Sequence, residues 1–283
     1  MNNLQLIDTL VSSVEDVKKY VFKYDEDILE VSYIRKNDGK DILCLPVQTS
    51  CNLGCQFCYL TGNGIKTKSL TYDKIITLVY KCIELQPPAN PTLLLSFMGT
   101  GETLMNYENV LNAAHNLLCH PGYSNVRFGV ASILPGRQRF NKFKELVVNL
   151  KLPVKLHWSL HSLCDISRKS LMPAATNIHD SIDMVEEYVT ETKNPAEIHY
   201  TLIDGINDTD QDLNKFIKYV TKKATIKFLK FAEKENNSMK ESIRTLFFKE
   251  QLENNGFIVE VYDPPGKDIK SSCGQFIIDQ YTK

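Results

Sequence analysis

The chain has 283 residues, of which 43% are hydrophobic and 24% charged, and its 33 basic and 34 acidic residues give a net charge of −1. Such a composition is ordinary for a globular protein with a sizeable core, of one large barrel-type domain or two small ones. The balanced charge gives no global argument for binding nucleic acid or membranes, so RNA binding would need a local patch. No apolar run is long enough to span a membrane, and no signal-peptide pattern opens the sequence.

The first forty residues predict a small extension that precedes the main domain. Residues 1–17 are expected to form a short helix and lead-in. Alternating apolar positions at Lys19–Lys23 and Leu29–Ile34, each followed by turn residues, indicate a β-hairpin. We therefore predict a helix and hairpin extension over residues 1–40.

Strands and helices alternate from Ile42 onward, which implies right-handed βαβ units and a parallel sheet. The expected strands are Ile42–Val47, Leu93–Phe97, Val126–Ala131, Val154–Leu160, Glu197–Ile203, Ile226–Phe231 and Phe257–Tyr262. The expected helices are Tyr72–Gln86, Tyr107–Cys119, Arg137–Leu150, Ile178–Thr192, Asp210–Lys223 and Met239–Asn255. Six βα units fit the pattern, so the fold class is α/β and residues 41–283 predict a partial (β/α)6 barrel. Ligands of such sheets bind beyond the carboxyl ends of the strands.

Three cysteines, Cys51, Cys55 and Cys58, follow the first barrel strand with three and then two residues between them. Thiolates this close cannot easily form disulfides without strain, but they can converge on one soft metal centre. A structural zinc site would need a fourth Cys or His at short spacing, and the next cysteine is Cys82. A [4Fe–4S] cluster is the other soft centre that cysteine runs ligate, and three cysteines leave one of its irons open. Zinc and chance core cysteines remain the alternatives, and the cluster favours a reducing cytoplasm.

Two further motifs follow expected strands. In the segment Met98–Glu102 the glycines permit close backbone approach, and Glu102 could accept hydrogen bonds from an ammonium group. The polar side chains of Ser159–His161 could contact a ligand, or could equally satisfy local backbone groups. A glycine turn at a strand end is common, so each motif is weak alone.

Five cysteines lie outside the cluster motif. Cys44 lies on the strand that leads into the cluster loop, and Cys273 lies near the C-terminus. Cys82 and Cys119, on apolar helices, are expected to be buried core thiols, and Cys164 either packs or approaches the site.

The cysteine spacing resembles that of the radical S-adenosylmethionine (SAM) enzymes, and all the motifs together resemble one of their families. This is the RlmN/Cfr group, the radical SAM adenosine methyltransferases of large-subunit ribosomal RNA. The order and approximate spacing of the motifs match those of the family from about residue 18 to 276. The pair Cys44 and Cys273 is specific to this family, because other radical SAM enzymes lack it. The matching stretches are Leu29–Ile34, Ile42–Cys44, Cys51–Cys58, Phe97–Tyr107, Trp158–His161, Ser170–Pro173, Leu202–Asp208 and Asp268–Gln275.

The resemblance implies a radical SAM barrel with two cofactors, a [4Fe–4S] cluster and SAM. Cys51, Cys55 and Cys58 would ligate the cluster, with SAM on its open iron. SAM would also be contacted by Gly101 and Glu102 after one strand, and by Ser159, Leu160 and His161 after another.

The resemblance also implies a catalytic set. Cys273 would carry a methyl group from one SAM, a second SAM would generate the radical, and Cys44 would release the product by disulfide formation. Glu30 matches, with one inserted residue, the glutamate assigned as proton acceptor, although on an alternating strand it could equally face solvent. The expected partners are ribosomal or transfer RNA, or an adenine-containing small molecule, and a flavodoxin-type electron donor. The protein is expected to be a cytoplasmic monomer without membrane contact.

The chain departs from the family in three ways. The N-terminal accessory domain that helps grip RNA is expected to be missing, since fewer than thirty residues precede Glu30. Gly129 and Ala232 stand where a serine and an asparagine that contact SAM are expected. These departures concern the substrate more than the reaction. The alternatives are a radical SAM enzyme of another outcome, acting on a small molecule or peptide, and a binding protein without activity.

Overall fold

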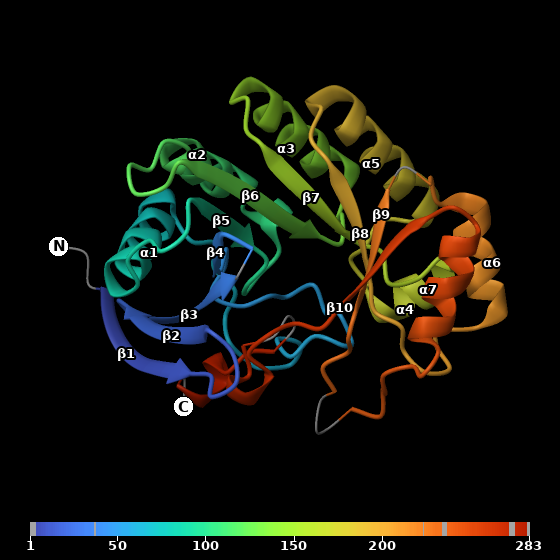
Figure 1. Cartoon of the computed structure of the whole chain (residues 1–283), viewed down its shortest axis with the longest axis horizontal. Helices are drawn as coiled ribbons and strands as arrows, with labels where there is room; N and C mark the ends of the chain where they lie inside the picture. The colour runs from blue at the N-terminus through green and yellow to red at the C-terminus, as the bar shows by residue number, and fades with distance from the viewer. Residues whose placement is uncertain (1–3, 37, 223, 234–236, 272–274, 282–283) are drawn as a thin grey trace.

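The computed structural model describes residues 4–36, 38–222, 224–233, 237–271 and 275–281. Ten strands form one curved sheet, and they follow one another in space in the order of the chain (Figure 1). Their bounds are β1 (Leu4–Val11), β2 (Val17–Tyr24), β3 (Asp27–Lys36), β4 (Lys40–Cys44), β5 (Thr92–Phe97), β6 (Asn125–Ser132), β7 (Val154–Ser159), β8 (Ala196–Tyr200), β9 (Thr225–Leu229) and β10 (Ile258–Tyr262).

The sheet changes character at β4. Strands β1 to β4 pair antiparallel as a meander, and β4 to β10 pair parallel. Strands β1 and β10 are the two edges of the sheet, so the barrel is open, as the predicted partial (β/α)6 barrel requires. The predicted boundary between residues 40 and 41 falls at the start of β4 and stays a prediction. The described helices are all too short or too polar to cross a bilayer.

The prediction of a helix near the N-terminus was wrong, because Leu4–Val11 form the edge strand β1. Exposure alternates at every residue along this strand, with Leu4 and Leu6 packed against the core. A period of two is that of a strand with one buried face, and pairing with β2 satisfies the backbone groups of that edge.

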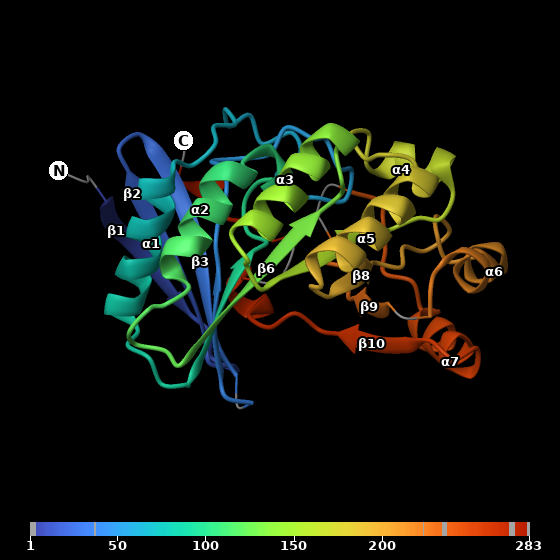
Figure 2. The same cartoon turned by 90° about the horizontal axis from the view of Figure 1, so that it is seen from above.

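The helices cover the convex face of the parallel strands (Figure 2). Their bounds are α1 (Tyr72–Leu85), α2 (Tyr107–Leu117), α3 (Arg137–Asn149), α4 (Asp165–Leu171), α5 (Ile178–Thr192), α6 (Asp210–Tyr219) and α7 (Thr245–Asn254), with 3-10 turns η1 (Thr103–Met105), η2 (Lys267–Ile269) and η3 (Ile278–Gln280). Helix α1 shows why they form. It begins at Thr71, whose side chain accepts the N–H of Lys74, and it buries Ile75, Leu78 and Cys82 at helical spacing.

Two helices differ from the expected elements. The short helix α4 was not predicted. Helix α7 begins six residues later than expected, because the preceding residues pair with the chain that follows β8. The Ser242 N–H donates to the Leu202 carbonyl, and Glu241 forms a bridge with Ile203. Such long-range pairing overrides local helix propensity.

Polar and apolar side chains alternate along the parallel strands. In β7, Leu156 and Trp158 join the main hydrophobic core, while Lys155, His157 and Ser159 lie on the other, concave face. The concave face therefore carries groups that can do chemistry, and the convex face supplies stability.

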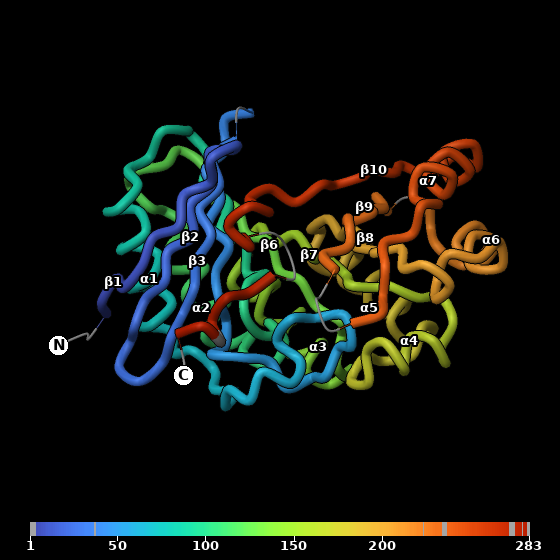
Figure 3. Tube along the Cα trace, turned by 90° about the horizontal axis from the view of Figure 1, so that it is seen from below, coloured from blue at the N-terminus to red at the C-terminus, as the bar shows by residue number. Residues whose placement is uncertain are grey.

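The chain after β10 turns back across the open side and reaches the N-terminal strands (Figures 1 and 3). The Asp268 carboxylate accepts from the Ser12 hydroxyl and the Ser13 N–H, each at 2.9 Å. The Tyr281 hydroxyl donates to Asp8 at 2.5 Å. The β1–β3 meander thus holds the C-terminal segment over the concave face.

Candidate functional site

The cysteine loop, residues 45–70, leaves the carboxyl end of β4. All three of its cysteines are partly buried. The Cys58 N–H donates to the Cys55 carbonyl at 3.1 Å, and the Thr61 hydroxyl donates to the same carbonyl at 2.7 Å. The N–H of Gln56, the residue after Cys55, donates to the carbonyl of Leu171 at the end of α4. The loop is therefore fixed by hydrogen bonds to its backbone.

The environment of these thiols fits a cationic cluster. Burial, together with the nearby charges of Cys58 and Glu102, raises the pKa of Cys51 to about 11, and the same causes raise that of Cys55 further. A bound metal deprotonates such a thiol and replaces its proton. Three soft donors in one loop, coupled electrostatically to one another, form a donor set that suits an iron–sulfur cluster.

Two glycines let the loop after β5 pass against the cysteine loop. A Cβ at Gly99 would lie 2.7 Å from the Leu45 carbonyl oxygen. Gly101 has φ +110°, and its Cβ would lie 2.8 Å from the Gln48 side chain. Only glycine accepts both the conformation and the close approach.

Glu102 lies directly beneath the cysteine loop and is 5% exposed. Its carboxylate accepts the N–H of Leu104 at 3.0 Å and that of Ile133 at 3.2 Å. Burial raises its pKa, while the Ser132 hydroxyl and the two N–H groups act in the opposite direction. The three donors leave the carboxylate with acceptor capacity for one more hydrogen bond, so a contact with an ammonium group remains chemically open.

The segment Ser159–His161 borders a cavity of about 150 Å³, which we call the strand-end cavity. It is lined among others by Phe57, Met98, Ser159, His161, His199 and Thr201. The Leu160 side chain is instead buried in the core, its N–H donates to the His199 carbonyl, and its own carbonyl accepts the Ser162 N–H.

His161 is held in one orientation. It has φ +47°, its Nδ1 accepts the Thr201 N–H at 3.0 Å, and its carbonyl accepts from Asn207 at 2.6 Å. Burial lowers its pKa to about 3, so the ring is neutral. The rings of His161 and Phe57, the residue before Cys58, pack edge to face with their centroids 4.8 Å apart.

Arg168 of α4 is a residue that the sequence analysis missed. Its buried guanidinium donates to the carbonyls of Ser159 at 3.2 Å and of Ile133 at 3.1 Å, and also to Leu160. Burial lowers its pKa to about 10, and Cys55 is among the groups whose charge acts on it. Arg168 therefore ties the loops after β6 and β7 together beside the cysteines. Nothing local in the sequence distinguishes it from a surface arginine of a short helix.

Cys44, the last residue of β4, borders a second cavity, which we call the thiol cavity. Glu30, Ser32, Met98, Ser271 and Gln275 also line it. Met98 lines both cavities, which therefore adjoin.

The predicted partner of Cys44, Cys273, lies outside the described residues. The nearest described residues before and after it, Ser271 and Gln275, line the thiol cavity together with Cys44. The Ser271 hydroxyl donates to that of Ser32 at 2.5 Å, and Ser32 pairs with Cys44 in the sheet.

Glu30 is buried and does not face solvent. Its carboxylate binds the ammonium of buried Lys19 at 2.7 Å and accepts the Ile277 N–H at 3.3 Å. Lys19 also donates to the Lys270 carbonyl at 2.6 Å. Burial raises the pKa of Glu30, and Lys19 and the backbone N–H groups oppose this rise. The pair Lys19–Glu30 therefore fastens the C-terminal chain at residues 270 and 277.

The remaining sequence predictions have mixed outcomes. Cys82 is buried, as expected, but Cys119 is exposed, because α2 ends at Leu117 and Cys119 falls beyond it. Cys164 is partly exposed at the N-terminus of α4. Ala232 lines the strand-end cavity, and a Cβ at Gly129 would lie 2.9 Å from the Met98 side chain.

Comparisons with known proteins extend these observations. No family model matches the chain. It is 28% identical over 277 residues to the probable dual-specificity RNA methyltransferase RlmN of Clostridioides difficile (strain 630), covering 94% of this chain and 77% of that protein. The equally named protein of Clostridium novyi (strain NT) is 28% identical over 280 residues, covering 95% of this chain and 78% of that protein.

Solved structures share the fold. A radical SAM methyltransferase from Sphaerobacter thermophilus matches with a TM-score of 0.83 and 22% identity, covering 98% of this chain and 82% of that one. A structure described as native anSMEcpe with bound AdoMet matches with a TM-score of 0.54 and 15% identity, covering 76% of this chain and 62% of that one. The chain is thus similar in sequence to proteins named RlmN and similar in fold to a radical SAM methyltransferase.

Proposed function

We propose that the protein is a radical SAM methyltransferase that transfers a methyl group through Cys273. One observation carries this proposal. Cys44 and the residues that flank Cys273, Ser271 and Gln275, line one cavity, and Met98 joins it to the strand-end cavity. Two thiols that must meet during a reaction need such a shared space.

The cofactors are assigned to the two loops beside these cavities. Cys51, Cys55 and Cys58 would hold a [4Fe–4S] cluster, which when reduced supplies the electron that cleaves SAM. Gly101 and Glu102 would orient the amino group of SAM, since Gly101 permits close backbone approach and Glu102 retains acceptor capacity. Ser159, the backbone of Leu160 and His161 would contact the rest of SAM from the strand-end cavity.

The thiols of Cys273 and Cys44 act in successive steps. The Cys273 thiolate attacks the methyl group of one SAM, so that a new sulfur–carbon bond forms and S-adenosylhomocysteine leaves. After this carbon has been joined to the adenine, Cys44 attacks the sulfur of Cys273. A disulfide forms, the bond between the Cys273 sulfur and the transferred carbon breaks, and its electron pair leaves with that carbon, which takes up a proton to give the methylated product.

Glu30 has two proposed roles. It is the proton acceptor that the family resemblance implies. Its contacts with Lys19 and Ile277 support a second role, in which it positions the chain that carries Cys273.

The proposed acceptor is an adenine base in RNA, since both similar proteins named above are called RNA methyltransferases. A smaller adenine nucleotide would fit the same chemistry. The flavodoxin-type electron donor, the monomeric state and the cytoplasmic location remain predictions from the sequence.

The test compares products of the wild type with those of Cys273→Ala, both with the cluster loaded and without oxygen. Ribosomal RNA, transfer RNA and adenine nucleotides are offered in turn. The wild type should form S-adenosylhomocysteine, 5′-deoxyadenosine and methyladenine, while Cys273→Ala should form no methyladenine despite an intact cluster absorption spectrum. If Cys273→Ala still methylates at the wild-type rate, the proposal fails. If the wild type forms 5′-deoxyadenosine but no S-adenosylhomocysteine, a radical enzyme of another outcome is indicated.

A further inference from the structure

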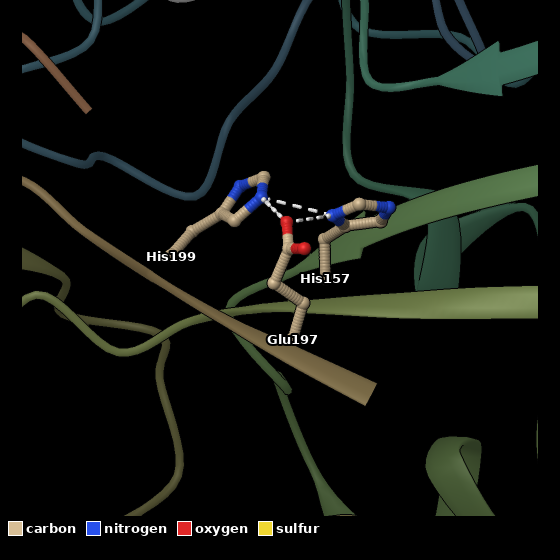
Figure 4. Close-up of side chains that lie close together, drawn as sticks. All are labelled: His157, Glu197 and His199. Carbon is tan, nitrogen blue, oxygen red and sulfur yellow. Dashed lines mark hydrogen bonds and ion pairs between the residues drawn. The ribbon is translucent and has the colours of Figure 1, made fainter. Parts of the chain in front are cut away.

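A cluster of titratable side chains lies on the concave face, beside the site described above. His157 extends from β7, and Glu197 and His199 extend from β8 (Figure 4). Glu197 Oε1 lies 3.1 Å from His157 Nδ1 and 2.9 Å from His199 Nε2, and the two nitrogens are 2.9 Å apart. The side chains are 11%, 2% and 10% exposed, so they are shielded from bulk water but remain reachable.

Protons alone cannot satisfy this triangle of atoms. A neutral imidazole carries one N–H and one nitrogen lone pair. If both inward nitrogens carry protons, two donors meet at 2.9 Å. If either lacks its proton, its lone pair meets the carboxylate oxygen of Glu197. Because Lys227 and Lys155 contact the Glu197 carboxylate, we take it as ionised, and every assignment of one proton to each ring then leaves one of the three contacts repulsive.

A cation at the centre of the triangle makes all three contacts favourable, because each atom then offers it a lone pair. Nitrogen and oxygen ligands lie about 2.0–2.2 Å from such an ion, and ligands at right angles are then about 2.8–3.1 Å apart. The three observed separations, 2.9 to 3.1 Å, fall in this range. Two imidazoles and one carboxylate on one face of an octahedron form a known site for divalent transition metals.

We propose that His157, Glu197 and His199 bind a divalent first-row transition-metal ion, with open positions toward the strand-end cavity. His199 lines that cavity together with Ser159 and Thr201, so a bound ion would be accessible from it. The site uses none of the cluster cysteines and does not rest on the proposed function.

Two lysines compete with such an ion. Lys227 binds Glu197 Oε1 at 2.9 Å, and Lys155 contacts the other oxygen. Both can move away, since Lys227 has a second partner in Glu260 at 3.3 Å and the Lys155 side chain is 36% exposed. Binding must displace Lys227 from Oε1, so removal of this ammonium should tighten it.

The test uses the full chain with its cluster loaded, so that Cys51, Cys55 and Cys58 are occupied. The protein is dialysed against micromolar cobalt(II), and bound cobalt is measured by mass spectrometry of the metal. The wild type should retain one cobalt per chain, and His157→Gln and His199→Gln should lose it. His179→Gln is the matched control, because His179 belongs to an exposed group with Asp180 and Asp183.

Lys227→Met keeps all three ligands and should lower the cobalt dissociation constant several-fold. It therefore tests the proposal even if the histidine variants fail to fold. Cobalt retained equally by wild type and both histidine variants would overturn the site, as would a Lys227→Met variant that binds no more tightly. No cobalt on any variant would mean that the three side chains form only a hydrogen-bond and ion-pair network.

Discussion

Replacing Lys19 by methionine should strongly destabilise the protein, because it leaves Glu30 buried without its counter-ion. Lys19 is 1% and Glu30 5% exposed, and their charged atoms are 2.7 Å apart. Removing one partner of such a pair costs about 3–5 kcal/mol in free energy of unfolding, since an uncompensated charge stays buried. Methionine preserves the packing of the lysine stem, so the charge is the main change.

The assay is urea unfolding at pH 8, followed by circular dichroism. Lys68→Met is the matched control, since Lys68 binds Asp27 at 2.6 Å but is 49% exposed, and its loss should leave stability near wild type. The double variant Lys19→Met/Glu30→Gln should recover part of the lost stability, because the buried charge is then gone.

The loss should also depend on pH. Burial raises the pKa of Glu30, and without Lys19 it rises further, so the folded variant gains a proton that the unfolded chain does not hold. The destabilisation is therefore largest above the folded pKa and shrinks as the pH falls toward the ordinary glutamate range. A Lys19→Met variant as stable as Lys68→Met at pH 8 would refute the reasoning.

Three further predictions concern single residues. Gly101→Ala should lower SAM affinity at least tenfold in equilibrium dialysis, because its φ is +110° and the new Cβ would meet Gln48 at 2.8 Å; unchanged affinity would contradict this. Asp41→Asn should cost about 1–3 kcal/mol at pH 7 in urea unfolding, since it weakens buried hydrogen bonds. Although burial alone raises the pKa of Asp41, its hydrogen bonds hold that pKa below the usual range, so the difference should vanish as the pH falls through it. Cys119→Ser should leave the melting temperature unchanged, whereas Cys82→Ser should lower it, and equal effects would contradict the burial assigned to them.

Local patterns predicted most of the fold. Strand–helix alternation and helix caps such as that of α1 depend on neighbouring residues, so the parallel part of the sheet followed from the sequence. Strand β1 was missed because its alternation is masked by consecutive apolar residues, Leu6 and Ile7. Helix α4 was missed because its seven residues give too little periodicity to detect.

The candidate site was predictable where its residues are close in sequence. The spacing of Cys51, Cys55 and Cys58 predicts a shared metal centre, and the composition of the Gly101–Glu102 turn predicts a ligand contact. The ion pair of Lys19 with Glu30 joins two strands through their register, and that register is a tertiary property. Arg168 acts on carbonyls from separate loops, which no local pattern reveals.

Peptide mass spectrometry across Cys273 tests the central claim most directly. The protein should be produced with cluster supply, purified without oxygen and digested under conditions that preserve thioethers. We expect a mass gain of one methyl group on the Cys273 peptide of the wild type, and a smaller gain or none in Gly101→Ala, which should bind SAM more weakly. An unmodified Cys273 after incubation of the wild-type protein with SAM and reductant would contradict the methyl-carrier mechanism.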